Sequence, residues 1–469
     1  MRSLLRLIIV PALVAWTACV TPVPQALEPQ HIPALFSAPT APNAPVWPSP
    51  DWWRGFGSPE LDSLITAART GNLDLAAAAA RVLEARAQSR IAGAALFPSV
   101  SLQGSAQRSR IGQGGVSTTA NAFGLSADAS YQADLWGRAR ADERSAVQLA
   151  LASRYAQETV ALTVTGDVAN TYLDVLALRQ RLGIARQNAA AAQRILTTVQ
   201  AKVRDGVSSQ LDLAQQQTQL ATIEATIPAL EEQEQEARYS LALLLGRVPE
   251  GFDVRGATID SIVAPEVAPG LPSELLRRRP DVAQAEANLA SVHANVDAAR
   301  AALFPEIGLT GSAGVASTAL STLFTSTGFV WSLGASLVQT IFDGGSRKGQ
   351  LELSRAQQQE FVASYRRAAL NAFVDVETAL SQVSSLAEQE RRRSVQATSA
   401  AEAFRIAEVQ YREGVTDLLN VLTAQQTLFS AQDQFVQVKL ARVQAVVGLY
   451  QALGGGWSES SDVATQTAP

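Results

Sequence analysis

The side chains that usually perform chemistry are few in this 469-residue chain, and they form no catalytic or metal-binding pattern. His31 and His293 are its two histidines, and neither has a further ligand at a spacing typical of a metal site. The sequence contains no nucleophile elbow, phosphate-binding loop or catalytic-triad signature. Arg277 to Arg279 could bind an anion, although a solvated patch at a helix start explains such a run more simply. We therefore expect neither enzymatic activity nor a cofactor.

Cys19, the one cysteine, is the residue best placed for covalent modification. Basic residues and an apolar run from Leu4 to Val14 precede it, in the order of a bacterial secretory signal. We predict that residues 1–18 are a lipoprotein signal peptide and that Cys19 carries the lipid. Trp16 departs from the usual aliphatic residue three positions earlier, so an ordinary cleaved signal is the alternative. Thr21, in place of an aspartate, is typical of lipoproteins destined for the outer membrane.

The composition argues against nucleic acid as a partner. Charged residues make up 17% of the chain and the net charge is −5, so the basic surface of a nucleic-acid-binding protein is missing. Beyond the start of the chain, no apolar run approaches the roughly 20 residues that a membrane-spanning helix needs. Nine prolines from Pro22 to Pro50 rule out a helix or central strand there, so we expect an extended tether.

The rest of the chain is an internal duplication. Ala94-Ala-Leu-Phe-Pro98 returns 207 residues later as Ala301-Ala-Leu-Phe-Pro305. After a one-residue shift, Arg204-Asp-Gly-Val207 corresponds to Arg412-Glu-Gly-Val415. A unit of about 200 residues is too long for a solenoid repeat, so we interpret it as one large assembly of helices and strands present twice.

Each half contains two segments in which apolar and polar residues alternate, as in strands with one apolar face. The apolar rows run from Val100 to Ala106, Phe123 to Ala133, Ile307 to Val315 and Phe329 to Leu337. About ten residues per strand suffice to cross an outer membrane, and these rows contain no charged residue, as lipid contact requires. Ile111 to Ala120 and Ser317 to Thr327 are expected to be outer loops. A soluble sheet packed on a core is the alternative.

The remaining segments are predicted to be helical. Arg138 to Arg204 contains no proline, so one helix of up to 67 residues is possible, with a counterpart from about Arg347 to Arg412. Gly206 and Gly414 would reverse the chain after these helices. Glutamines at positions such as Gln216 and Gln425 could face water on an inner or an outer surface, and a solvent-exposed rod explains them equally well.

Four membrane strands per chain cannot close a barrel, and an open sheet edge in lipid leaves backbone groups without partners. Several chains must therefore combine their strands. Two chains would provide about eight strands, which enclose a filled interior, whereas three would provide about twelve and begin to open a lumen. Inward-facing polar residues, among them Asp128 and Asp134, favour the wider barrel.

Several motifs resemble those of the TolC-type outer-membrane efflux proteins, in the lipoprotein branch called NodT. They are Leu276-Arg-Arg-Arg-Pro-Asp-Val282, Ala299-Arg-Ala-Ala-Leu-Phe-Pro305, Phe342-Asp-Gly-Gly345, Tyr411-Arg-Glu-Gly414 and Leu422-Thr-Ala-Gln425. The resemblance implies a mixed membrane protein: a trimeric channel-tunnel with a twelve-stranded β-barrel, four strands coming from each chain. A long periplasmic α-helical barrel and a mixed α/β equatorial region would continue it.

The resemblance and the repeat together divide the chain into consecutive segments. In order, these are the signal peptide 1–18; the anchor, tether and start of the equatorial region 19–70; repeat 1 at 71–245, with strand hairpin 98–134 and helical hairpin 138–245; the equatorial linker 246–276; repeat 2 at 277–454, with strand hairpin 305–342 and helical hairpin 346–453; and the polar tail 455–469.

The resemblance also assigns roles at the two helical hairpin tips. A carboxylate on the first tip and a tyrosine on the second help to close the periplasmic mouth in the family, and Asp212 and Tyr411 occupy these positions. Departures from the family pattern, which put a salt-bridge latch and an acidic selectivity ring in doubt, lie at Thr416, Asn420 and Thr423. Asp417 either replaces a missing charge or simply starts a helix.

The expected function is passive conduction of small molecules, such as drugs and toxic compounds, from the periplasm to the exterior. The resemblance implies a homotrimer in the bacterial outer membrane, lipid-anchored and extending into the periplasm. Its partners would be outer-membrane lipid, a periplasmic adaptor and an inner-membrane pump of the resistance-nodulation-division class. Export of proteins in type I secretion and a periplasm-spanning structural lipoprotein are the alternatives.

Overall fold

The computed structural model describes residues 36–37, 47–113, 116–266, 268 and 270–458. Cys19, the signal peptide and most of the proline-rich tether lie outside the described residues. The first half of the chain contains the 3₁₀ turn η1 (Trp52–Phe56) and then α1 (Pro59–Gly71), α2 (Leu73–Ala94), β1 (Ser99–Gln113), β2 (Val116–Ala133), α3 (Arg138–Arg204) and α4 (Gln210–Leu244). The remainder contains η2 (Ile259–Ser261), α5 (Pro272–Leu275), α6 (Pro280–Ala301), β3 (Glu306–Ser317), η3 (Leu320–Thr322), η4 (Ser326–Gly328), β4 (Phe329–Val338), α7 (Ser346–Arg412) and α8 (Leu418–Ala452).

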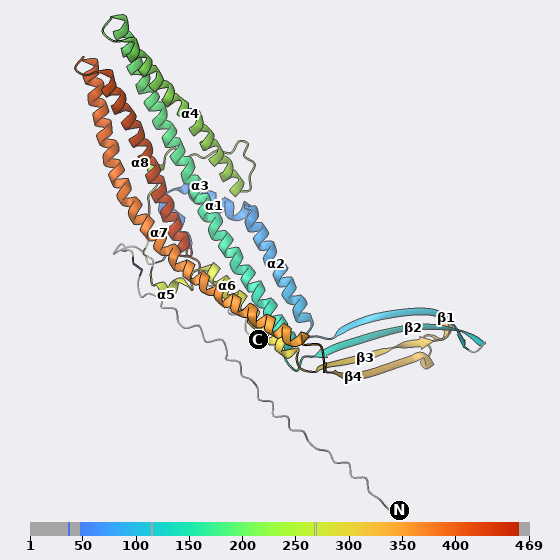
Figure 1. Ribbon diagram of the computed structural model, residues 1–469. Coiled ribbons are helices and arrows are strands. Elements are labelled where there is room, and N and C mark those ends of the chain that lie inside the picture. Colours follow the sequence, from blue (N-terminus) through green and yellow to red (C-terminus); the bar gives the residue numbers. More distant parts are fainter. Residues whose placement is uncertain (1–35, 38–46, 114–115, 267, 269, 459–469) are drawn as a thin grey trace, which may run out of the picture.

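Two long helical hairpins, α3–α4 and α7–α8, form the body of the protomer (Figure 1). Their turns lie together at one end, and the strands leave from the opposite end. Helix α3 runs unbroken for 67 residues, as its lack of proline predicts, and α7 has the same length. Helices α2 and α6 both pack against α3, beside the half of that helix that is nearer the strands.

The four strands form one antiparallel sheet in the order β1-β2-β3-β4, so β1 and β4 are its edges. The register places the predicted apolar rows side by side: Leu102 pairs with Ala127, Ala127 with Ala313, and Ala313 with Trp331. One face of the sheet is therefore continuously apolar. The expected outer loop from Ile111 to Ala120 is wrong, because pairing continues to Gln113 and Val116. Backbone hydrogen bonds extend a hairpin regardless of small polar side chains.

Side chains at the end of the sheet nearest the helices stabilise the junctions between the strands and the long helices. The Asp134 carboxylate accepts hydrogen bonds from the backbone N–H groups of Ala139 and Arg140, at 3.2 and 3.0 Å. This carboxylate replaces a cap that Gly137 cannot provide to α3. Trp136 stacks on Phe304, with ring centroids 4.8 Å apart, and so joins the two repeats at this level.

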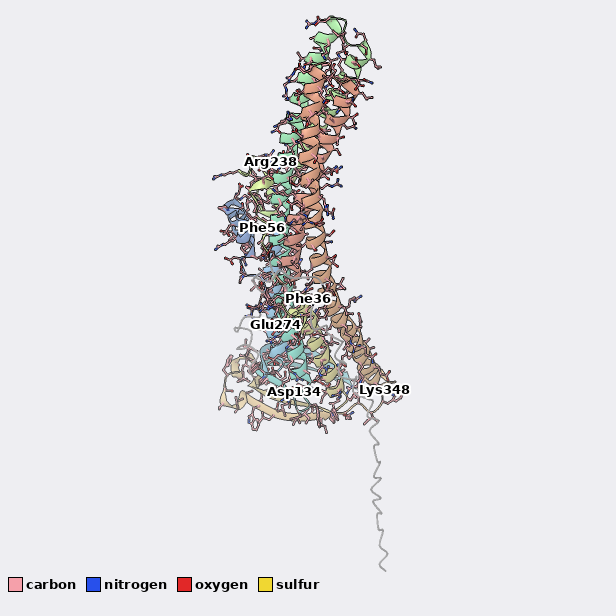
Figure 2. All side chains as sticks on the ribbon, turned by 90° about the vertical axis from the view of Figure 1, so that its left-hand side faces the viewer. Phe36, Phe56, Asp134, Arg238, Glu274 and Lys348 are labelled. Atoms are coloured by element: carbon pink, nitrogen blue, oxygen red, sulfur yellow. The ribbon has the colours of Figure 1, made fainter. Side chains whose placement is uncertain are left out.

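The largest apolar core lies part of the way along the helices, where short segments surround α3 and α8. Trp52 stacks on Tyr450 with centroids 4.9 Å apart, and Phe56 is fully buried beside them. Arg179 of α3 donates to Glu234 of α4 at 2.8 Å and to the Gly256 carbonyl at 2.8 Å, which fixes the linker against the helices. Figure 2 shows the labelled Phe56 and Arg238 between the hairpin tips and the strand end of the protomer.

Two glutamines expected to face water are instead completely buried. Gln216 donates its amide hydrogen to the Ala192 carbonyl at 2.9 Å, whereas neither amide atom of Gln425 has a hydrogen-bond partner among the described residues. Both side chains lie between packed helices of a single protomer. Among the helices that the structure describes, none is long and apolar enough to cross a membrane.

Candidate functional site

Both helical hairpins turn in the same way at their tips. In each, the residue after the glycine donates to a carbonyl five residues back: Val207 to Lys202 and Val415 to Gln410, both at 2.8 Å. The glycines adopt the left-handed conformation that this ending requires, with φ of 73° at Gly206 and 78° at Gly414. The structure thus places both predicted tip glycines at the chain reversals.

The second helix of each hairpin begins with a side-chain cap. Ser209 and Asp212 form a capping box on α4, in which each side chain binds the backbone N–H of the other residue. Asp417 caps α8, and its carboxylate accepts a hydrogen bond from the Asn420 backbone N–H at 3.1 Å. Of the two interpretations of Asp417, this geometry corresponds to the helix start.

Tyr411 is the point where the two tips meet. Its side chain is only 6% exposed, and its phenol oxygen is buried without a hydrogen bond of good geometry among the described residues. Lys202 of α3 donates from Nζ to the Tyr411 carbonyl at 2.6 Å, and the same nitrogen lies 4.3 Å from the centre of the tyrosine ring. These contacts join α3 to α7 at the tips.

The charge of Asp212 acts on this tyrosine. Burial raises the pKa of the Tyr411 phenol, the Ser208 hydroxyl opposes that shift, and the negative Asp212 raises the pKa further. Hydrogen bonds from the Ser209 backbone N–H and the Ser208 hydroxyl lower the pKa of Asp212, which is therefore ionised at neutral pH. The structure thus brings together the two residues that the resemblance singled out for closure.

The other predicted tip residues make local contacts on α8. Asn420 donates from Nδ2 to the Thr416 hydroxyl at 2.8 Å, and Thr423 donates to the Leu419 carbonyl at 2.9 Å. Asn420 and Thr423 are exposed in the protomer. None of these described contacts reaches Asp212 or Tyr411.

Sequence reasoning missed Lys202 and Ser208. The two tips differ at the positions of the lysine and the tyrosine. The first repeat has Val203 at the position of Tyr411, and the second repeat has Gln410 at the position of Lys202. A comparison of the repeats position by position would have found this pair, since neither residue belongs to a recognisable motif.

Apolar side chains also stand out at the tips. Val207 and Leu211 are 75% and 65% exposed on the first tip, and Val415 and Leu419 are 73% and 61% exposed at the equivalent positions of the second. Duplicated apolar groups in such exposed positions are typical of a surface that contacts another protein.

The described residues contain no group of histidine, cysteine, aspartate and glutamate side chains that could hold a metal ion. His293 lies on α6 with its Nδ1 2.7 Å from the Gln358 amide of α7, so it joins two helices. His31 lies outside the described residues.

Comparisons with known proteins agree with this arrangement. A family model described as "Outer membrane efflux protein" matches residues 64–247 and 271–455. The chain is 40% identical to the pyoverdine export outer membrane protein OpmQ of Pseudomonas putida over 465 residues, which cover 97% of this chain and 98% of that protein. It is 31% identical to the cation efflux system protein CusC of Escherichia coli over 411 residues, covering 87% and 88%.

A solved structure of the outer-membrane channel OprN has the same architecture. It matches with a TM-score of 0.85 at 29% identity, and the match covers 91% of this chain and 98% of that one. The two family matches coincide with the two halves that each provide a strand pair and a long helical hairpin. The chain therefore belongs to the outer membrane efflux protein family, and it is the outer-membrane channel of an efflux pump, extending into the periplasm, rather than an enzyme.

Proposed function

We propose that three copies of the chain form one conduit, with twelve strands in the outer membrane and the helical hairpins in the periplasm. The support comes from the sheet of a single protomer. Its edges, β1 and β4, have no described neighbour on their outer sides, and its apolar face exposes large side chains such as Leu102 and Leu333 at 74% and 80%. Joining β1 of one chain to β4 of the next satisfies the edges and directs that face to lipid.

The conduit takes its partners at the hairpin tips. The exposed apolar side chains Val207, Leu211, Val415 and Leu419 provide a surface for a periplasmic adaptor, which connects the channel to an inner-membrane pump of the resistance-nodulation-division class. Such a channel is passive, and the pump supplies energy and selects the cargo. Relatives are named for the export of pyoverdine and for the efflux of cations, so we assign this chain small-molecule cargo only as a class.

The anchor and the segment boundaries are part of the same proposal. Cys19 carries a lipid that holds the chain at the membrane, which rests on the sequence pattern around that residue. Residues 19–70 and 246–276 contribute to the equatorial region, and the two repeats occupy 71–245 and 277–454. The packing of α1 and η2 against α3, and of η1 against α1, supports this division.

The gate consists of Tyr411, of Lys202, which contacts the carbonyl and the ring of Tyr411, and of Asp212, whose carboxylate accepts a hydrogen bond from Ser208. Its single strongest support is that Lys202 of the first hairpin contacts both the carbonyl and the ring of Tyr411, which is buried on the second hairpin. Moving the hairpins apart would expose Tyr411 and separate these groups, so the contact favours the closed arrangement. Thr416, Asp417, Asn420 and Thr423 border this gate on the second tip, with Gly206 and Gly414 at the turns.

Conductance of the purified trimer in a planar bilayer tests the proposal. Tyr411→Phe and Asp212→Ala are each expected to raise the closed-state conductance several-fold, because the first removes the phenol oxygen next to the Ser208 hydroxyl and the second removes the carboxylate that this hydroxyl binds. Tyr450→Phe is the control, since it removes a phenol that is equally buried, at 5% exposure, but lies in the equatorial core. Wild-type conductance in both gate variants would remove the gate assignment, and purification of monomers alone would contradict the assembly.

A further inference from the structure

The polar face of the sheet, opposite its apolar face, carries a carboxylate within a row of hydroxyl groups. Asp128 lies on this face in β2, and the register pairs it with Ser101 of β1 on one side and with Ser312 of β3 on the other. Ser312 in turn pairs with Ser332 of β4. Residues paired directly across an antiparallel sheet share a face, so one row across all four strands consists of three serines and this aspartate.

Two acidic side chains lie on the polar face of the described strands, and they differ in their partners. Glu306, at the helical end of β3, forms an ion pair with Arg138 at 2.9 Å. Asp128 accepts a hydrogen bond from the Ser126 hydroxyl at 2.8 Å, and no described basic side chain forms an ion pair with it. The other described residues of this face are uncharged, and most are serine, glycine, glutamine or alanine. The negative charge of Asp128 is therefore not neutralised within the protomer.

The proposed assembly turns this polar face toward the lumen, because the apolar face meets lipid. Threefold symmetry then places the three copies of Asp128 at one height. Twelve strands about 4.8 Å apart and tilted by about 40° enclose a cylinder with a backbone radius of about 12 Å. An aspartate side chain reaches about 4 Å inward, so each carboxylate lies about 8 Å from the axis of the barrel.

The salt concentration determines how strongly these three charges act on a passing ion. The Debye length is about 10 Å at 0.1 M salt and about 3 Å at 1 M, so the field of Asp128 reaches the axis only in the more dilute solution. In water, Coulomb's law for three charges about 8 Å away favours a monovalent cation over an anion by about tenfold at 0.1 M salt. At 1 M salt the preference falls below about twofold. The serine hydroxyls of the same row bring no opposing charge.

We propose that Asp128 makes the barrel selective for cations, so that positively charged solutes pass the membrane-spanning part of the channel more easily than negatively charged ones. The inference rests on the proposed trimer, because three chains must bring their carboxylates around one lumen. Asp128 acts through its electric field on solutes already inside the tunnel, in addition to the selection made by the pump.

Reversal potentials of the purified trimer in a planar bilayer, recorded under a KCl gradient, measure this selectivity. Wild-type channels should favour K⁺ over Cl⁻, and D128N should lower the permeability ratio about tenfold near 0.1 M KCl but less than about twofold near 1 M. D128E keeps the charge and should retain the ratio. The double variant D128N/S312D moves the carboxylate to the paired position on β3 and should restore the ratio that D128N loses.

The matched control is N121D, because Asn121 lies on the same strand but on the opposite face, where the register pairs it with Arg108. A carboxylate added there stands outside the lumen and should leave the permeability ratio unchanged. An unchanged ratio in D128N, no recovery in D128N/S312D, or an equal change in N121D overturns the inference and leaves the channel assignment standing. A wild-type chain that forms no trimer, or a trimer that conducts no ions, contradicts the proposed function instead.

Discussion

Lys202 is the residue that most directly ties the two hairpin tips together, because its ammonium binds both the carbonyl and the ring face of Tyr411. Lys202→Met keeps the aliphatic stem and removes both contacts. We expect opening of the last turn of α7 to become easier by about 1–2 kcal/mol, with a higher closed-state conductance. Hydrogen exchange at that turn and bilayer conductance measure the two effects.

Arg204→Met is the control for this prediction. It removes the same charge from an exposed position only two residues away, at the end of α3. Faster exchange in Lys202→Met alone supports the bridge. Equal exchange in the two variants would mean that general charge at the tip, rather than the contact with Tyr411, holds the hairpins together.

Because of Asp212, we expect the stability of the closed tip to depend on pH in the acidic range. Its pKa is held below the ordinary value of 3.8 by hydrogen bonds, so its stabilising contribution is complete at neutral pH and is lost as the pH falls through the lowered pKa. Burial raises the pKa of Tyr411, so the phenol stays neutral. We expect a closed-state conductance that is constant from about pH 6 to 9 and rises only below about pH 4.

Asp212→Asn should abolish that acid-induced rise, because its side chain has no proton to gain. Its conductance at neutral pH should already match that of acidified wild-type protein. Planar-bilayer recordings across the pH range test this, and an acid rise that persists in the variant would assign the effect to another group.

At the residue scale, the resemblance indicated two candidate closing residues, but the sequence did not indicate which side chain contacts them. These residues are Asp212 and Tyr411, and the negative charge of Asp212 raises the pKa of the Tyr411 phenol. Lys202 and Tyr411 lie 209 residues apart, and no spacing rule within a helix connects two hairpins. Their contact follows from tertiary packing, which is why only a comparison of the two repeats could have suggested it.

At the scale of elements, the helices could be predicted more closely than the strands. A long segment without proline, ended by a glycine, defines α3 because chain breakers act locally. The length of the β1–β2 hairpin could not be predicted in the same way, since the pairing of Gln113 with Val116 depends on the partner strand.

Gln425 provides a test of packing within the long hairpins. It is fully buried in α8, and both its amide atoms lack hydrogen-bond partners among the described residues. Gln425→Met keeps the volume and removes this desolvation cost, so we expect a stabilisation of about 1–3 kcal/mol and a higher Tm. Gln216→Met should stabilise less, because Gln216 donates to the Ala192 carbonyl. An unchanged or lower Tm in Gln425→Met would indicate an ordered partner for that amide.

At the scale of the whole molecule, the two repeats share a hydrogen bond between the beginning of one helix and the end of the helical hairpin in the same repeat. Asn72 donates to the Leu244 carbonyl in the first repeat, and Arg279 donates to the Ala452 carbonyl at the equivalent place in the second. Each bond ties the start of a short helix to the end of a helical hairpin. Arg279 also forms ion pairs with Asp281 and with Asp375 of α7, so in the second repeat the same side chain connects α7 as well. The duplication is therefore one of contacts as well as of sequence.

The glycines beside these two hydrogen bonds should tolerate substitution poorly. Gly246 and Gly454 have φ of 66° and 85°, and a Cβ on either would overlap a backbone carbonyl oxygen, that of Gly71 or of Arg278. The tip glycines Gly206 and Gly414 have similar φ values but open space around them. Alanine should therefore cost about 1 kcal/mol at each tip, from backbone conformation alone, and at least about 3 kcal/mol at Gly246 and at Gly454.

Thermal unfolding of the solubilised variants, followed by circular dichroism, measures this difference. Gly349→Ala is the control, since this glycine lies inside α7 with helical backbone and open space, and alanine there should raise the Tm slightly. A larger loss of Tm at Gly246 and Gly454 than at Gly206 and Gly414 would show that stability resides where each repeat closes. Low cost at the tips leaves those hairpin ends free to move, which a gate requires, whereas equal losses at all four glycines would contradict this division between a rigid equator and mobile tips.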